Sequence, residues 1–192
     1  MPNVLAFVTY VAATTFTPGP NNIMAMANAS RYGLRRSMRF TTGVCVGFFL
    51  IVGLSITFTM ALYGAIPALK PVMTVIGATY ILWLAWKTAT SSPHDEGAAG
   101  QSTFASGVVL QFLNPKAILY GITVSSTFIV PYYGAVPVLI AFAAALALVS
   151  LVSTSTWALF GSLFEGVSAG RRRIVGYVMA ALLVYCAVAL FV

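Results

Sequence analysis

Acidic side chains are almost absent from this sequence: its 192 residues include only three, Asp95, Glu96 and Glu165, against ten lysines and arginines. Charged residues of both signs make up 7% of the chain, whereas a soluble domain carries about a quarter. A chain of this composition cannot cover a water-facing surface, which excludes a soluble protein. With 60% hydrophobic residues, it is predicted to be a single integral membrane domain of about six spans.

Metal-ligating and redox side chains are equally scarce. The one histidine, His94, lies in a polar stretch and is interpreted as a solvated loop residue. Cys45 and Cys186 lie inside apolar runs without the spacing of a metal or disulfide motif. We therefore expect no metal and no cofactor. The net charge of +7 is attributed to basic loops that orient the protein in the lipid bilayer, and not to nucleic-acid binding.

Apolar runs predict an all-α integral membrane fold of six transmembrane helices. Their expected ranges are 4–29, 40–62, 72–89, 104–130, 136–160 and 174–192. A polar connector, 91–103, separates two halves of three spans, 1–90 and 104–192, so that the second half enters the membrane from the opposite side. The single domain 1–192 is thus expected to be a 3+3 inverted repeat.

Basic residues predict the orientation of these spans. The loops after spans one, three and five carry four arginines, one lysine and three arginines, eight in all, and the other loops carry only Lys70. The positive-inside bias then places both termini outside the cytoplasm, and no signal peptide is evident at the N-terminus. Span two contains Gly43 and Gly47 in a GxxxG pattern, which serves either internal packing or a homo-oligomer.

Two of the predicted spans are interrupted in matching positions. Span one contains TPGPNN at 17–22, and span four contains LNPK at 113–116. Paired broken helices at the membrane midplane are typical of secondary transporters, which bind their substrate at the breaks. The alternative is a pair of proline kinks that serve only packing. The predicted substrate-binding residues are Thr17, Pro18, Gly19, Pro20, Asn21, Asn22, Gln111, Asn114, Pro115 and Lys116.

Lys116 carries the strongest functional signal in the sequence, because it is a cation near the middle of span four. Such a charge costs about 2.5–3.5 kcal/mol and marks a ligand site or pathway. All three acids lie in predicted loops, so its counter-ion is expected to be a substrate carboxylate or nearby carbonyls, unless desolvation leaves it neutral. The substrate's ammonium group would then rest on the neutral dipoles of the two breaks. This arrangement suits a small neutral amino acid and disfavours a cationic one.

The two breaks and a third segment resemble signatures of the LysE/RhtB family of amino-acid exporters. The similarity is carried by TPGPNN with the arginine-rich segment 31–39, by GATYILWLAWK at 77–87 and by QFLNPKAILYG at 111–121, in order and over essentially the whole chain. The resemblance implies a six-helix protein of the bacterial inner membrane. It also implies export of small amino acids of the cysteine and O-acetylserine type, driven by the proton gradient.

Two other functions remain open from the sequence. An enzyme could use Lys116 with Ser125 or Ser126 as a Ser-Lys pair, although these serines lie about two and a half turns along the helix. A channel could also use a polar midplane, but channels usually show rings of repeated residues. If the protein exchanges protons, Lys116 is the candidate carrier, because no carboxylate lies at depth.

Overall fold

The computed structural model describes residues 4–61 and 103–163, and single residues between 75 and 90 and between 174 and 188. Within these parts every regular element is a helix, and no strand occurs. The elements are α1 (Val4–Phe16), α2 (Pro20–Tyr32), α3 (Leu34–Ala61), α5 (Phe104–Leu113), α6 (Pro115–Val124), the π-helix η2 (Ser125–Ile129) and α7 (Val136–Ser162). The all-helical class is confirmed for the described residues.

Long apolar helices account for part of the predicted membrane topology. Among the described residues, α3 and α7 are each long and apolar enough to cross a membrane. The pair formed by α5 and residues 115–129 is bent by 67° at its break and is either a third, broken span or a re-entrant loop. The spans predicted at 72–89 and 174–192 and the connector 91–103 lie largely outside the described residues, so the six-helix inverted repeat stays a prediction.

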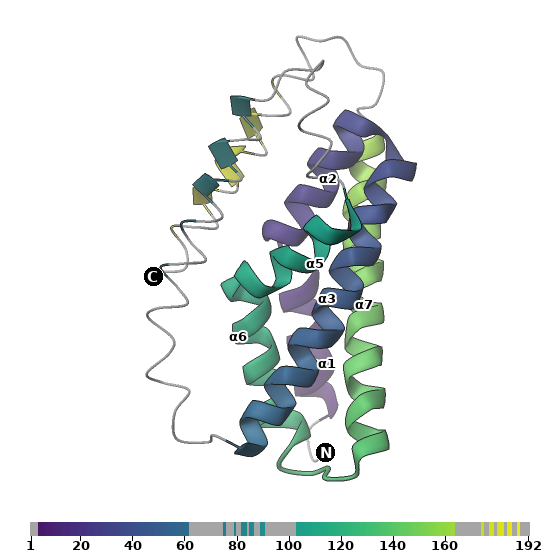
Figure 1. The fold of residues 1–192 in the computed structure, drawn as a ribbon, viewed down its shortest axis with the longest axis vertical. Coiled ribbons are helices and arrows are strands. Elements are labelled where there is room, and N and C mark those ends of the chain that lie inside the picture. Colours follow the sequence, from purple (N-terminus) through teal and green to yellow (C-terminus); the bar gives the residue numbers. More distant parts are fainter. Residues whose placement is uncertain are drawn as a thin grey trace.

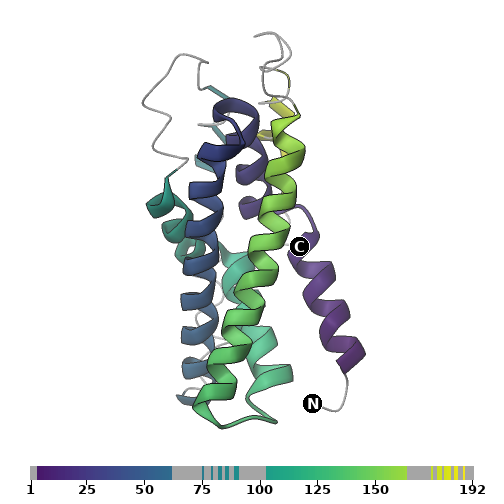
Figure 2. The same cartoon turned by 90° about the vertical axis from the view of Figure 1, so that its right-hand side faces the viewer.

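The helix α3 is the one on which the others pack, because α2, α5, α6 and α7 all contact it (Figures 1 and 2). Glycines allow its close approach to α5. A Cβ on Gly43 would overlap the backbone of Phe104, and a Cβ on Gly107 would overlap that of Phe40. Gly47 faces α5 one turn further along α3. The GxxxG pattern therefore serves packing inside this chain.

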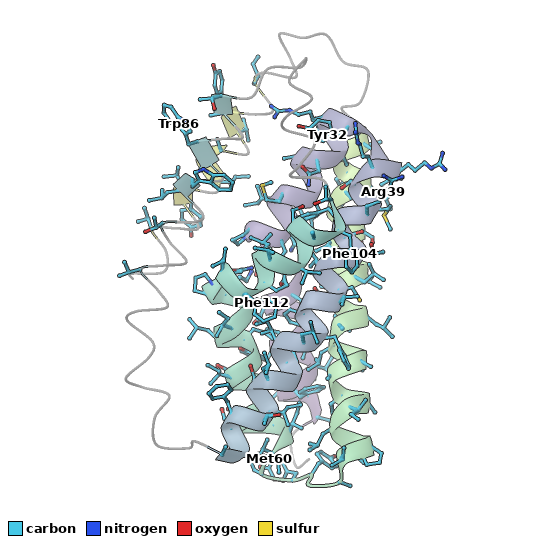
Figure 3. All side chains as sticks on the ribbon, in the orientation of Figure 1. Tyr32, Arg39, Met60, Trp86, Phe104 and Phe112 are labelled. Atoms are coloured by element: carbon cyan, nitrogen blue, oxygen red, sulfur yellow. The ribbon has the colours of Figure 1, made fainter. Side chains whose placement is uncertain are left out.

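The arginine-rich segment 31–39 is helical, and the prediction that it forms a loop is wrong. A single residue, Gly33, joins α2 to α3 with a φ of 82°, a conformation that glycine adopts without a Cβ clash. Three of the four arginines then belong to α3, which begins at Leu34. Arg39 lies at one end of the bundle and Met60 at the opposite end (Figure 3).

We predict that Gly107→Ala lowers the unfolding temperature of the purified protein, because the added methyl group meets the backbone of Phe40 and Val44. Overpacking of this kind costs about 1–3 kcal/mol. Gly53→Ala is the matched control, since its Cβ would point into open space and alanine favours the helix. Equal unfolding temperatures for the two variants in detergent would contradict the predicted packing.

Candidate functional site

The first break joins α1 to α2 through residues 17–19, so that α1 lies below α2 in Figure 2. Gly19 is the extended residue before α2, and Pro20 begins the helix, where its missing N–H is not needed. The last carbonyls of α1, and those of the linking residues, lack the helical donors that would follow. Because an unpaired carbonyl at membrane depth costs several kcal/mol, the break depends on other donors.

Side chains from α2 and α7 supply donors to the end of α1. The carbonyl of Thr15 accepts a hydrogen bond from Asn22 Nδ2 and another from Ser153 Oγ, both at 2.9 Å. The indole N–H of Trp157 donates to the carbonyl of Phe16 at 3.3 Å. Ser153 Oγ also lies 3.3 Å from Asn22 Oδ1. The end of α1 is therefore fixed to α7 by two side chains of that helix.

Lys116 lies in the second break, but its side chain donates hydrogen bonds to residues of the first break. Its ammonium group donates to Thr17 Oγ1 at 2.9 Å and to the carbonyls of Thr17 and Pro18 at 3.3 Å each. Thr17 itself donates its N–H to the carbonyl of Ala13 and its hydroxyl to that of Thr14. Every carbonyl from 13 to 18 thus has a donor, and the ammonium group of Lys116 is one of these donors.

A set of amide groups, of which Gln111 and Asn114 are buried and Asn21 is half-buried, joins the two breaks. Asn21 and Gln111 exchange two hydrogen bonds through their side chains, at 2.9 and 3.0 Å, and Asn114 Nδ2 donates to Asn21 Oδ1 at 2.9 Å. Asn114 also caps α6 by accepting from the Lys116 N–H at 3.1 Å, with Pro115 at the first helical position. In each break the residue before the new helix is followed by a proline, and Asn21 bonds to Gln111 of α5 and to Asn114 in the second break.

A cavity opens beside the breaks and contains about 370 Å³ of atom-free space with its mouth included. Much of this volume is open to solvent, and the space open to the centres of water molecules is about 40 Å³, room for a few waters. Lys116 is the one charged side chain among the described residues that line it. The lining consists of Thr14, Thr15, Gly19, Pro20, Asn21, Asn22, Phe48, Asn114, Lys116, Ala117, Tyr120 and Ser150.

The ten residues predicted from the sequence all lie in this region, but only some of them line the cavity. Thr17 and Pro18 hold the Lys116 ammonium group, Gln111 lies behind Asn21, and Pro115 begins α6. Gln111 is fully buried and does not line the cavity. The remaining six line the cavity: Gly19, Pro20, Asn21, Asn22, Asn114 and Lys116.

Sequence reasoning missed several residues of the cavity wall. Tyr120 follows Lys116 by four residues on α6 and so shares its face of the helix, a signal that was available. Ser150 belongs to a polar cluster, 150–156, in an otherwise apolar span. Thr15 and Phe48 carried no local signal, because they reach the cavity only through the packing of α1 and α3 against α6 and α7.

The described residues do not form the Ser-Lys pair that an enzyme would need. The hydroxyl of Ser126 donates to the carbonyl of Thr123 at 3.4 Å. The hydroxyl of Ser125 is buried and has no hydrogen-bond partner among the described residues, so it does not bond to Lys116. This arrangement disfavours the nucleophilic mechanism.

Comparison with known proteins finds similarity along nearly the whole chain. The family described as LysE type translocator matches residues 12–192. The cysteine/O-acetylserine efflux protein of Salmonella typhimurium is 42% identical over 187 residues, which cover 97% of this chain and 96% of that protein. The cysteine/O-acetylserine efflux protein of Escherichia coli K12 is 39% identical over the same shares of both chains. No solved structure matches the chain with significance.

We predict that Asn21→Ala lowers the unfolding temperature, because it leaves the buried amides of Gln111 and Asn114 without their partner. Each unsatisfied group costs about 1–3 kcal/mol. Adding Gln111→Leu should restore part of the loss, since both partners of one pair are then apolar. Thr57→Val, which removes an exposed hydroxyl elsewhere on α3, is the control. If Asn21→Ala proves as stable as that control, the amide set does not hold the breaks together.

Proposed function

Because the chain belongs to the LysE type translocator family, we propose that it is a secondary transporter that exports small neutral amino acids from the bacterial cytoplasm. The relatives named as cysteine/O-acetylserine efflux proteins support substrates of this size and polarity. The observation that carries the proposal is the position of Lys116, the one charged side chain among the described residues that line a small cavity between the two breaks.

The substrate carboxylate binds between Lys116 and the N-terminus of α2. No side chain caps this helix, and Pro20 has no N–H to offer. The first N–H groups of α2 that lack an intrahelical acceptor therefore belong to Asn21 and Asn22, and both residues line the cavity. The positive end of the helix dipole stabilises an anion by about 0.3–1 kcal/mol, and Lys116 adds a full charge.

The substrate ammonium group takes the oxygens that hold Lys116 in the structure. These are the hydroxyl and carbonyl of Thr17 and the carbonyl of Pro18. When Lys116 turns toward the carboxylate, its own donors leave these oxygens, and the incoming ammonium group replaces them. The exchange keeps every carbonyl of the break paired throughout binding.

The location that fits this activity is the bacterial inner membrane. The positive-inside bias places the end of the bundle that carries Arg39 in the cytoplasm and both termini outside it. Substrate then enters the cavity from the arginine-rich end and leaves toward the end that carries Met60.

We predict saturable counterflow of labelled O-acetylserine in vesicles that contain the purified protein. Unlabelled cysteine and other small neutral amino acids should compete, and lysine and arginine should not. A cationic side chain adds a second positive charge beside Lys116, and no described residue of the lining is acidic. Preference for the cationic amino acids would refute the substrate class, and single-channel conductance across a bilayer would favour a channel.

Substitutions of Lys116 test whether it binds the substrate and whether it carries the coupled proton. Lys116→Ala should abolish competition by amino acids, whereas Arg39→Gln, which removes an equal charge at the exposed end of the bundle, should not. Lys116→Arg should keep binding but lose export driven by an imposed pH gradient, because arginine does not release its proton in proteins. Full gradient-driven export by Lys116→Arg would rule out Lys116 as the proton carrier and leave the binding role intact.

A further inference from the structure

Two buried hydroxyl groups in the cavity wall have no hydrogen-bond partner among the described residues. They belong to Thr15 and Tyr120, and both residues line the cavity. The side chain of Tyr120 is only 4% exposed. The two hydroxyls lie near each other but do not meet the geometry of a hydrogen bond. Since buried polar groups in proteins are almost always bonded, this pair in a cavity wall is placed to bond to a molecule that enters the cavity.

Packing fixes the position of both hydroxyls. The ring of Tyr120 contacts those of Tyr10 and Phe48, with centroid distances of 5.6 and 5.2 Å. The backbone of Thr15 is held by its two side-chain donors at the end of α1. Tyr120 also lies one turn beyond Lys116 on the same face of α6. A molecule bound to Lys116 through its carboxylate therefore has the hydroxyl pair within the same cavity.

The rest of the wall near the pair limits what can bind there. Phe48 and Ala117 contribute apolar surface, and Ser150 contributes a further hydroxyl. A short side chain with one polar terminal group matches this combination of two hydroxyls and apolar walls. An aliphatic side chain of the same size would leave both hydroxyls unbonded, and a longer one would exceed the small cavity.

We propose that Thr15 and Tyr120 form the side-chain subsite of the amino-acid site, an inference that rests on the proposed function. Their hydroxyls bond to an oxygen or sulfur atom at the end of a short substrate side chain. The site thereby prefers side chains that carry a hydroxyl, thiol or acetyl ester group over aliphatic side chains of equal size. Thr15 and Tyr120 are specificity-determining residues, whereas Lys116 binds the carboxylate that all amino-acid substrates share.

A series of three amino acids tests the subsite directly. Serine, cysteine and 2-aminobutyrate share one skeleton and differ only in the terminal group of the side chain. Their inhibition constants are measured against counterflow of labelled O-acetylserine in vesicles containing the full chain. The wild type is expected to bind serine about tenfold more tightly than 2-aminobutyrate, the factor that corresponds to one hydrogen bond.

Two variants remove the hydroxyls and keep the shape of the side chains. Tyr120→Phe and Thr15→Val should each bring the ratio of the inhibition constants of serine and 2-aminobutyrate close to one. They should do so by weakening the binding of serine and cysteine, without weakening the binding of 2-aminobutyrate. Tyr132→Phe removes the hydroxyl of an exposed tyrosine outside the cavity lining and should keep the wild-type ratio.

Unchanged ratios in both variants, or a wild type that does not distinguish serine from 2-aminobutyrate, would overturn the subsite. If Tyr120→Phe disturbs the aromatic stack and fails to fold, as judged by gel filtration, the isosteric Thr15→Val variant decides. Failure of the proposed function gives a different result, because the wild type would then show no counterflow of any amino acid in the series.

Discussion

The carbonyls that the first break frees are the constraint on which the rest of the site depends. A helix that stops at Phe16 and restarts at Pro20 leaves the carbonyls of 14–18 without helical donors. In an apolar membrane protein water does not supply these donors, so other parts of the chain must. Residues of α2, α6 and α7 are fixed in place by this requirement, as far as the structure describes them.

The donors fall into two groups with different chemistry. Asn22, Ser153 and Trp157 are neutral and buried or half-buried, and their bonds hold the end of α1 against α2 and α7. Lys116 is charged, flexible and on the cavity wall. Breaking a neutral donor's bond would expose a carbonyl with nothing to replace it. The Lys116 bonds can be exchanged, because a substrate ammonium group offers the same three donors.

Local sequence patterns were enough to predict some of these features but not others. Proline, glycine and asparagine in apolar runs predicted both breaks, since these residues mark interrupted helices wherever they occur. The helical state of segment 31–39 was missed because one glycine makes the whole turn, and clustered arginines suggested a longer loop. The role of Trp157 could not be predicted, because its bond to Phe16 depends on contact with another helix. The sequence pointed to Lys116 as a cation in the second break, yet its bonds to Thr17 and Pro18 follow only from the packing of α6.

Gly19 shows how closely the exchangeable donor and the break fit each other. A Cβ at this position would lie 3.0 Å from the Lys116 ammonium nitrogen and 3.1 Å from its Cδ. The backbone of Gly19 is extended, with a φ of −168°, which any residue can adopt. A Cβ here would push the Lys116 side chain aside by a few tenths of an ångström, so glycine matters for the space that it leaves and not for its conformational freedom. That space is where the Lys116 side chain passes to reach the carbonyls. A site built only to cap the break could use a fixed neutral donor, as the end of α1 does. A charged side chain that passes over a glycine can instead leave the carbonyls and return, and the exchange with a substrate depends on that movement.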